Sequence, residues 1–333
     1  MCKKSSLTKD RLIHRSGTNP SQGVIKPMRK KYYRIVNESV IGDAPKDVIR
    51  FYQYKKGRIA NPKTWPKYIA KIGHKWYPNE SITEHFFTSI GKSFGIEIAN
   101  SQLVFAEGYI RFLSEHFHTD EQSLVHGANI LSRFLSENDT KWIDDLDNEK
   151  ALKGEINVED VIIALQHVFP DESILNSFID MLLFDCLTGN NDRHYYNWGV
   201  ITHIKRKHAP YFSPVYDTAR GLYWNNDEKF ILSLHALSEK EQNNRIKKYV
   251  NNSVPKISIP NNHKCNHFEL IAHLKKNNRI NTNHIERWTN YSSLENTLEI
   301  LNKDFVKLFT AQRRHIIEKI LKLRFQKLKD III

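Results

Sequence analysis

The chain has 333 residues, of which 40% are hydrophobic, and its formal net charge is +13. This length is typical of one large or two modest domains, and the apolar content suffices for a sizeable core. No apolar run approaches the roughly 18 residues of a membrane-spanning helix, so we expect no membrane span. The three cysteines are few, odd in number and far apart, which argues for a reducing compartment and against a disulfide framework.

The positive charge is spread along the chain, and no basic stripe with interleaved aromatic residues stands out. We therefore interpret it as a solvated surface and do not expect nucleic acid as a direct ligand. Residues 1–30 are polar, basic and without periodicity, which predicts a flexible leader. Because this leader lacks an apolar segment, we expect no secretory signal and predict a cytoplasmic protein.

The next part of the chain predicts strands. Residues 31–40 and 47–54 indicate two strands around a turn with one glycine, Gly42. A strand–turn–strand unit covers the phosphates of ATP in kinases, but taken alone this segment favours an ordinary hairpin. Residues 65–73 predict a third strand, in which Lys71 lies among apolar side chains. A lysine there needs a partner or an exit to water, so Lys71 either binds phosphate or points to solvent from an edge strand.

A helix is predicted from Glu80 to about Gly95, with Glu84 near its start. Two interpretations of Glu84 stay open. It pairs with Lys71, which we favour slightly, or it forms a capping box with Ser81.

A hairpin follows at residues 101–117, because apolar runs at residues 102–106 and 109–113 flank Glu107 and Gly108, a turn pair. From about residue 118 the chain predicts mainly helices. One covers residues 157–168, and a longer one begins at Asp171 and ends at Gly189.

The last predicted helix, residues 305–328, has an apolar stripe and many basic residues. We interpret it as packing on the helical part of the protein, in preference to binding a membrane or a partner. His263, Cys265 and His267 alternate like zinc ligands, but no second ligand pair is evident, so we do not expect a metal there.

The most informative stretch follows the helix that ends at Gly189. It carries Asp192 and Asn197 in a polar loop, and Asp217 follows in the sequence Pro-Val-Tyr-Asp. Phosphoryl transfer uses this set of groups: one carboxylate accepts a proton, and an asparagine and a second carboxylate hold magnesium. Asp and Asn also favour turns for their own reasons, so each motif alone would be a weak signal.

Together, N-x-D-R-H-x-x-N-x-G at residues 190–199 and P-x-Y-D at residues 214–217 resemble the catalytic and metal loops of the HipA-like bacterial serine/threonine kinases. The resemblance implies an α+β, two-lobed, protein-kinase-like fold. The predicted domains are the leader at residues 1–30, a small β-rich N-lobe at residues 31–115 and a larger, mostly helical C-lobe at residues 116–333.

The resemblance also implies the roles of the site residues. Asp192 would be the catalytic base. The role of His194 is inferred from its position alone: it lies two residues after Asp192, and we expect it to brace the loop. The cofactors would be ATP and Mg²⁺, the metal being held by Asn197 and Asp217. The predicted nucleotide-binding residues also include Lys71, Glu84, Glu115, His116 and Phe117, of which the last three form the hinge that contacts adenine. Ser39, in the glycine-poor loop, is the candidate for autophosphorylation.

The function that follows is an ATP- and Mg²⁺-dependent protein serine/threonine kinase. The resemblance implies autophosphorylation, a role as a toxin or host-acting effector, a protein substrate and an antitoxin partner. The alternatives are a kinase-fold phosphotransferase for a small molecule and a nucleotide-binding pseudokinase scaffold. No activation segment with an A-P-E ending is visible, so the mode of regulation stays open.

Overall fold

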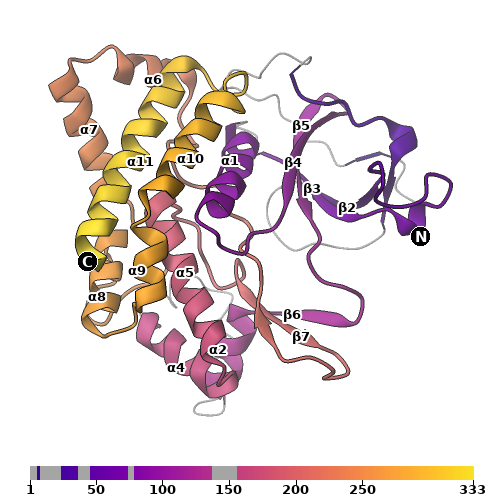
Figure 1. Cartoon of the computed structure of the whole chain (residues 1–333), viewed down its shortest axis with the longest axis horizontal. Coiled ribbons are helices and arrows are strands. Elements are labelled where there is room, and N and C mark those ends of the chain that lie inside the picture. Colours follow the sequence, from indigo (N-terminus) through magenta and orange to yellow (C-terminus); the bar gives the residue numbers. More distant parts are fainter. Residues whose placement is uncertain (1–5, 8–23, 37–45, 74–78, 137–155) are drawn as a thin grey trace.

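The computed structural model describes residues 6–7, 24–36, 46–73, 79–136 and 156–333. A small antiparallel sheet lies at one end of the molecule and a larger helical body at the other (Figure 1). This arrangement confirms the predicted α+β class. Ser39 and Gly42, in the loop proposed to cover phosphates, lie outside the described residues.

The first sheet contains five antiparallel strands in the order β1-β2-β3-β5-β4. They are β1 (Tyr33–Ile35), β2 (Lys46–Phe51), β3 (Lys67–Ile72), β4 (Ser101–Ala106) and β5 (Tyr109–Glu115). The predicted hairpin is β4–β5. Its turn residues Glu107 and Gly108 have φ angles of 51° and 89°, as a tight turn with two left-handed residues requires.

The two faces of this sheet pack against different parts of the protein. Successive side chains of a strand point to opposite faces, so β3 places Tyr68 and Ala70 in a small core with Ile49 and Leu113 and turns Lys71 to the other face. Helix α1 (Asn79–Ser93) packs against that second face. Ser81 lies inside α1 and not at its N-cap, so the alternative capping box with Glu84 is wrong.

A second, three-stranded sheet lies beside the helical body. It consists of β6 (Gln122–His126), β7 (Gly199–His203) and β8 (Tyr211–Phe212), in the order β6-β7-β8. The sequence did not predict β6. Four of its five residues are only partly buried and Ser123 is exposed, and they carry little alternation. The strand is stabilised by pairing with β7, which lies far along the chain.

The helical body contains, among the described residues, the helices α2 (Gly127–Ser136), α4 (Val158–Val168), α5 (Glu172–Thr188), α6 (Glu228–His235), α7 (Glu239–Asn251), α8 (His267–Lys276), α9 (Thr282–Trp288), α10 (Tyr291–Lys303) and α11 (Ala311–Ile332). In the described ranges, no helix is long and apolar enough to cross a membrane.

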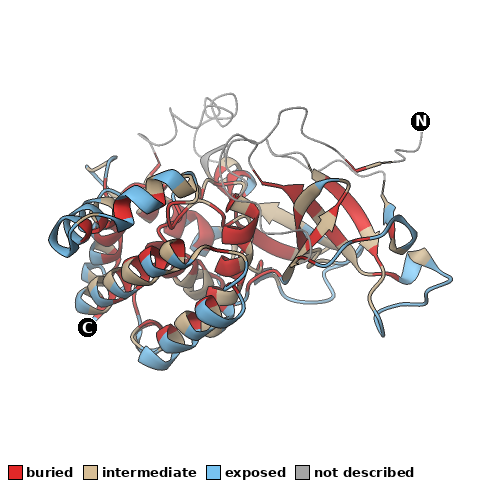
Figure 2. Ribbon diagram, turned by 90° about the horizontal axis from the view of Figure 1, so that it is seen from above, coloured by how far each residue is buried: buried red, intermediate tan, exposed pale blue. Residues whose placement is uncertain are grey.

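Helix α5 runs through the core and ends at the candidate catalytic loop. Asp171 caps its start by accepting a hydrogen bond from the Ser173 N–H. Gly189, with a left-handed φ of 70°, ends it, as predicted. The second half of α5 is buried continuously from Met181 to Thr188, and the burial view shows the inner faces of the surrounding helices turned to the same core (Figure 2). A buried helix of this kind gives the loop that follows it a rigid base.

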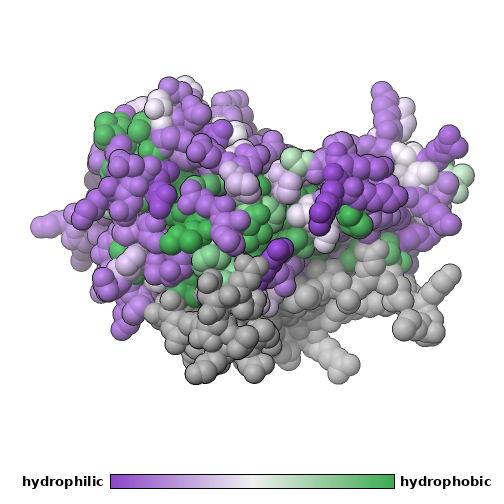
Figure 3. Space-filling view, turned by 90° about the horizontal axis from the view of Figure 1, so that it is seen from below, coloured by the Kyte–Doolittle hydropathy of each residue, from purple (hydrophilic) through white to green (hydrophobic). Residues whose placement is uncertain are grey.

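Helix α11 packs along this body, as predicted, but it begins at Ala311 and not at residue 305. The physical reason is its N-cap, because the Thr310 hydroxyl accepts a hydrogen bond from the Arg313 N–H. Two of its basic residues are buried: the Arg313 Nε donates to Glu228 at 2.6 Å, and the Arg324 Nε donates to the Cys186 carbonyl at 2.7 Å. Among the described residues on the face shown in Figure 3, most are hydrophilic, and the hydrophobic ones gather near the middle.

Candidate active site

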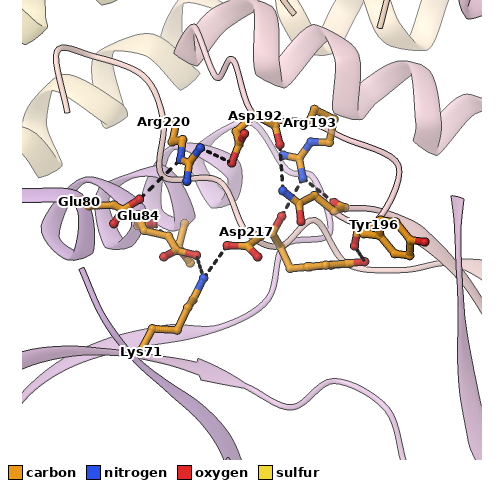
Figure 4. Close-up of polar contacts among 11 residues, drawn as sticks. Lys71, Glu80, Glu84, Asp192, Arg193, Tyr196, Asp217 and Arg220 are labelled. Atoms are coloured by element: carbon orange, nitrogen blue, oxygen red, sulfur yellow. Dashed lines mark hydrogen bonds and ion pairs between the residues drawn. The ribbon is translucent and has the colours of Figure 1, made fainter. Parts of the chain in front are cut away.

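Lys71 lies between two carboxylates (Figure 4). Its Nζ donates to Glu84 Oε1 at 2.6 Å and to Asp217 Oδ1 at 2.7 Å. The Lys71 side chain is 10% exposed and that of Glu84 6%, whereas Asp217 is 41% exposed. Lys71 therefore does not point to solvent, and it joins the small sheet, helix α1 and the Asp217 loop at one point.

The three groups shift one another's pKa. Burial alone would lower the pKa of Lys71, but Asp217 and Glu84 raise it above its ordinary value. Burial raises the pKa of Glu84 to about 7, against the opposing effect of Lys71. Burial would also raise the pKa of Asp217, but the Lys71 ammonium holds it well below its usual range. One ammonium is thus shared by two carboxylates, and Asp217 is the one that ionises more readily.

The backbone fixes the position of Asp217. Its φ of 55° lies in the left-handed region, which Asp tolerates better than most residues and which often marks functional sites. Just before it, the Val215 N–H donates to the Glu97 carbonyl at 2.8 Å, and the Val215 carbonyl accepts from the Ala99 N–H at 2.9 Å. These bonds attach the loop to the segment between α1 and β4.

Arg193, in the middle of the catalytic motif, is buried and holds two loops together. Its Nε and Nη2 donate to Asp185 at 2.8 and 3.0 Å. Its Nη1 donates to the carbonyls of Asn197 at 2.6 Å and of Tyr216 at 2.7 Å. One guanidinium therefore fixes the loop of Asp192 to the residue before Asp217.

Asp192 and Asn197 lie on this braced loop. The Asn197 Nδ2 donates to the Asp192 carbonyl at 2.8 Å, and its Oδ1 makes no hydrogen bond to another described residue. The Asp192 side chain is 18% exposed, and its Oδ2 lies 3.1 Å from the Arg220 Nη1. Burial raises the pKa of Asp192, and Arg220 acts in the opposite direction. Asp192 is thus a partly exposed carboxylate that forms an ion pair with Arg220.

His194 contacts its own loop. The backbone N–H of His194 donates to the Asp192 carbonyl at 2.9 Å, and the ring Nδ1 accepts from the backbone N–H of Tyr196 at 3.3 Å. These are the contacts of a residue that shapes the loop.

The three predicted hinge residues differ in what they offer a nucleotide. The Glu115 N–H donates to the Asn100 carbonyl at 2.7 Å, and the His116 N–H donates to the Lys67 carbonyl at 2.9 Å, so both donors serve the protein itself. The Phe117 N–H bonds to no described residue, and its ring lies 5.5 Å from that of Tyr216. Of these three residues, Phe117 is therefore the one whose backbone N–H is not used by a hydrogen bond to a described residue.

The side-chain oxygens of Asp217 and Asn197 are ligands of the kind that magnesium prefers. Mg²⁺ in nucleotide sites takes one or two protein carboxylates and completes its shell with phosphate and water oxygens. Asp217 supplies a partly exposed, readily ionised carboxylate, and Asn197 supplies an amide oxygen. In the part of the chain that the structure describes, no group of three or more His, Cys, Asp or Glu residues could hold a metal alone.

At residues 263–267, Cys265 is buried and its thiol donates to the Ile257 carbonyl.

Sequence reasoning gave no role to two arginines of this site. Arg193 stands inside the motif, and Asp185 eight positions earlier was a signal for a buried partner. Arg220 gave no local signal, because both of its carboxylate neighbours, Asp192 and Glu80, are distant in the chain.

Known proteins resemble this chain over most of its length. A curated relative, the serine/threonine-protein kinase CtkA of Helicobacter pylori strain J99, is 29% identical over 154 residues. That match covers 46% of this chain and 43% of the relative, so the chain matches less than half of the relative's length. The crystal structure of a Helicobacter pylori proinflammatory kinase, CtkA, aligns over 90% of this chain and 94% of that chain, with a TM-score of 0.68 and 19% identity.

The structural match confirms the predicted kinase-like fold. The HipA structure of Shewanella oneidensis MR-1, solved with HipB and operator DNA, aligns over 79% of this chain and 60% of that chain, with a TM-score of 0.44 and 13% identity, too little to support an argument. The family model described as the HipA-like C-terminal domain matches residues 20–291. The chain therefore belongs to the HipA-like C-terminal domain family.

Proposed function

We propose that this chain is an ATP- and Mg²⁺-dependent protein serine/threonine kinase. The observation that carries the proposal is the contact of Lys71 with both Glu84 and Asp217, beside the loop of Asp192 and Asn197. A buried lysine held by a helix glutamate and a metal-loop aspartate is the arrangement that kinases use for the phosphates of ATP. The name of the curated relative supports the same activity.

In this proposal each residue has a separate task. Magnesium–ATP, when bound, supplies the phosphoryl group and neutralises its charge. Asp217 and Asn197 would hold the metal, and Lys71, kept in place by Glu84, would contact the α- and β-phosphates. Phe117 would donate its N–H to adenine. Asp192 would accept the proton of the serine or threonine hydroxyl as that oxygen bonds to the γ-phosphorus and the bond to the β–γ bridging oxygen breaks.

A labelling experiment tests this function. The purified chain is incubated with labelled ATP, magnesium and a generic protein acceptor, beside an Asp192→Asn variant. We expect label on protein with the parent and none with the variant. Binding of ATP without transfer by either would favour a small-molecule acceptor or a nucleotide-binding scaffold. Absence of magnesium-dependent ATP binding would reject the roles of Lys71 and Asp217.

Mass spectrometry of the labelled parent tests autophosphorylation, with Ser39 as the expected site. A toxin or effector role and an antitoxin partner stay predictions from the family resemblance. Expression of the parent and of the Asp192→Asn variant in a bacterial host would test the first, because a toxic kinase slows growth only when it is active.

A further inference from the structure

Helix α1 presents two glutamates to the site. Glu80 and Glu84 are four residues apart, so they lie on the same face of the helix. Glu84 contacts Lys71, as described above. Glu80 Oε1 lies 3.8 Å from the Nε of Arg220, whose Nη1 lies 3.1 Å from Asp192 Oδ2. Figure 4 shows this second connection, which runs from α1 through Arg220 to Asp192.

The backbone holds Arg220 at this position. Its carbonyl accepts a hydrogen bond from the N–H of Asn191, the residue before Asp192, at 3.1 Å. The next residue, Gly221, packs against the end of α5, since a Cβ there would lie 2.3 Å from the Thr188 carbonyl oxygen. The guanidinium lies over the Trp224 ring at 5.3 Å. Arg220 is therefore a fixed part of the site, although its side chain is 34% exposed.

The contact with Arg220 makes the two oxygens of Asp192 unequal. Oδ2 forms an ion pair with the guanidinium at 3.1 Å, whereas Oδ1 forms neither an ion pair nor a hydrogen bond with another described residue. A carboxylate held through one oxygen keeps the other in a defined direction, which is what a base requires to receive a proton. Arginine suits this task because its planar, permanently charged guanidinium can form ion pairs with two carboxylates at once, as it does here with Asp192 and Glu80.

We propose that Arg220 is a positioning residue that, together with Glu80, aims the carboxylate of Asp192 at the acceptor hydroxyl. One face of α1 thereby sets both halves of the site, the phosphate-binding lysine through Glu84 and the base through Glu80 and Arg220. The inference rests on the proposed kinase function and adds to it the residues that orient the base.

The test separates kcat from the KM for ATP. We expect Arg220→Gln to lower kcat by about 10- to 100-fold, as misplacement of a catalytic group does, with ATP affinity and its KM changed less than about twofold. Arg220→Lys should recover only part of kcat, because an ammonium is a point charge and cannot form the same fork. Glu84→Gln should show the opposite pattern, a raised KM for ATP. Arg245→Gln on α7, an exposed arginine, controls for loss of one positive charge.

A double variant tests the connection to α1. Glu80→Gln should lower kcat less than Arg220→Gln does. The double variant should have the same kcat as Arg220→Gln alone, because both substitutions break the same series of contacts from α1 to Asp192. Thermal melting of each variant checks that it is folded.

The inference is overturned if folded Arg220→Gln keeps full kcat while Asp192→Asn is inactive, or if Arg220→Gln weakens ATP binding as strongly as it weakens transfer. An inactive parent, or an active Asp192→Asn variant, rejects the proposed function, and the role of Arg220 fails with it.

Discussion

Ionisation of Glu84 is disfavoured first by its burial and then by the nearby negative charge of Asp217, with which it shares the single ammonium of Lys71. Burial raises the pKa of folded Glu84 to about 7 from an ordinary value of 4.5. Between these values the folded chain keeps a proton that the unfolded chain releases. The stability that this proton contributes is complete below the lower value and is lost as the pH rises through the higher one.

We therefore expect a specific difference between the parent and Glu84→Gln, which cannot titrate at this position. As the pH rises from about 5 to about 8, the free energy of unfolding of the parent should fall relative to the variant by on the order of 3 kcal/mol. Urea denaturation at several pH values measures it. Parallel curves for the two proteins would contradict the assignment of a raised pKa to Glu84.

Arg193 gives a second prediction at the scale of one residue. Arg193→Met leaves the carboxylate of Asp185 buried with only the Asn190 amide to bond it, and should destabilise the chain by about 3–5 kcal/mol. The double variant with Asp185→Leu removes the stranded charge and should recover part of that loss. Denaturation of the two single variants and the double variant measures the coupling. Additive losses would show that the pair does not act as a unit.

At the scale of elements, the end of α5 and the loop that carries Asp217 are packed without spare room. A Cβ on Gly221 would meet the Thr188 carbonyl oxygen at 2.3 Å and the Phe87 ring at 3.0 Å. Backbone cannot move aside as a flexible side chain can, so Gly221→Ala must push the loop away from α5.

We expect Gly221→Ala to destabilise the chain by about 1–3 kcal/mol and to lower kcat, because Arg220 and Asp217 shift with the loop. Gly108→Ala is the control. Its φ of 89° makes alanine unfavourable, but nothing lies within 4 Å of the added Cβ, and the turn is remote from the site. It should therefore lose stability and keep kcat. Equal kcat in both variants would contradict the role given to the packing at Gly221.

The elements that sequence reasoning predicted are those whose signals are local. The β4–β5 hairpin has its turn pair, and α5 has Asp171 and Gly189 at its ends. The pairing of Lys71 with Glu84 followed from their closeness in the chain and from the resemblance. What it missed depends on contacts between distant segments: the pairing of β6 with β7, and the contact of Arg220 with Asp192. No periodicity or spacing encodes such contacts, which appear only once the chain is folded.

At the scale of the whole molecule, α1 joins the two parts of the fold. It lies against the small sheet, yet its apolar residues belong to the core of the helical body. Phe86 lies 4.9 Å from Phe305, and Phe94 stacks on Trp288 at 5.1 Å (ring centroids). Because the helix that carries Glu80 and Glu84 is held by residues from the end of the chain, the site depends on C-terminal packing that is distant in sequence.

This arrangement predicts that the sheet and the helical body unfold together. Phe325 of α11 is buried and lies close to Phe94, the residue that follows α1, and to Tyr291 of α10, with ring centroids 6.3 and 5.1 Å away. Phe325→Ala should lower the free energy of unfolding by about 3–5 kcal/mol. The exposed Leu232→Ala on α6 should change it by less than about 0.5 kcal/mol.

Denaturation followed by tryptophan fluorescence and by circular dichroism should give one coincident transition in the parent and in both variants, since α1 cannot leave the C-terminal core without exposing its apolar face. If the two probes separate in Phe325→Ala, the helical body can unfold while the sheet remains. In that case α1 would be held mainly by the sheet, and Glu80 and Glu84 would owe their positions to β4 and β5 in place of α10 and α11.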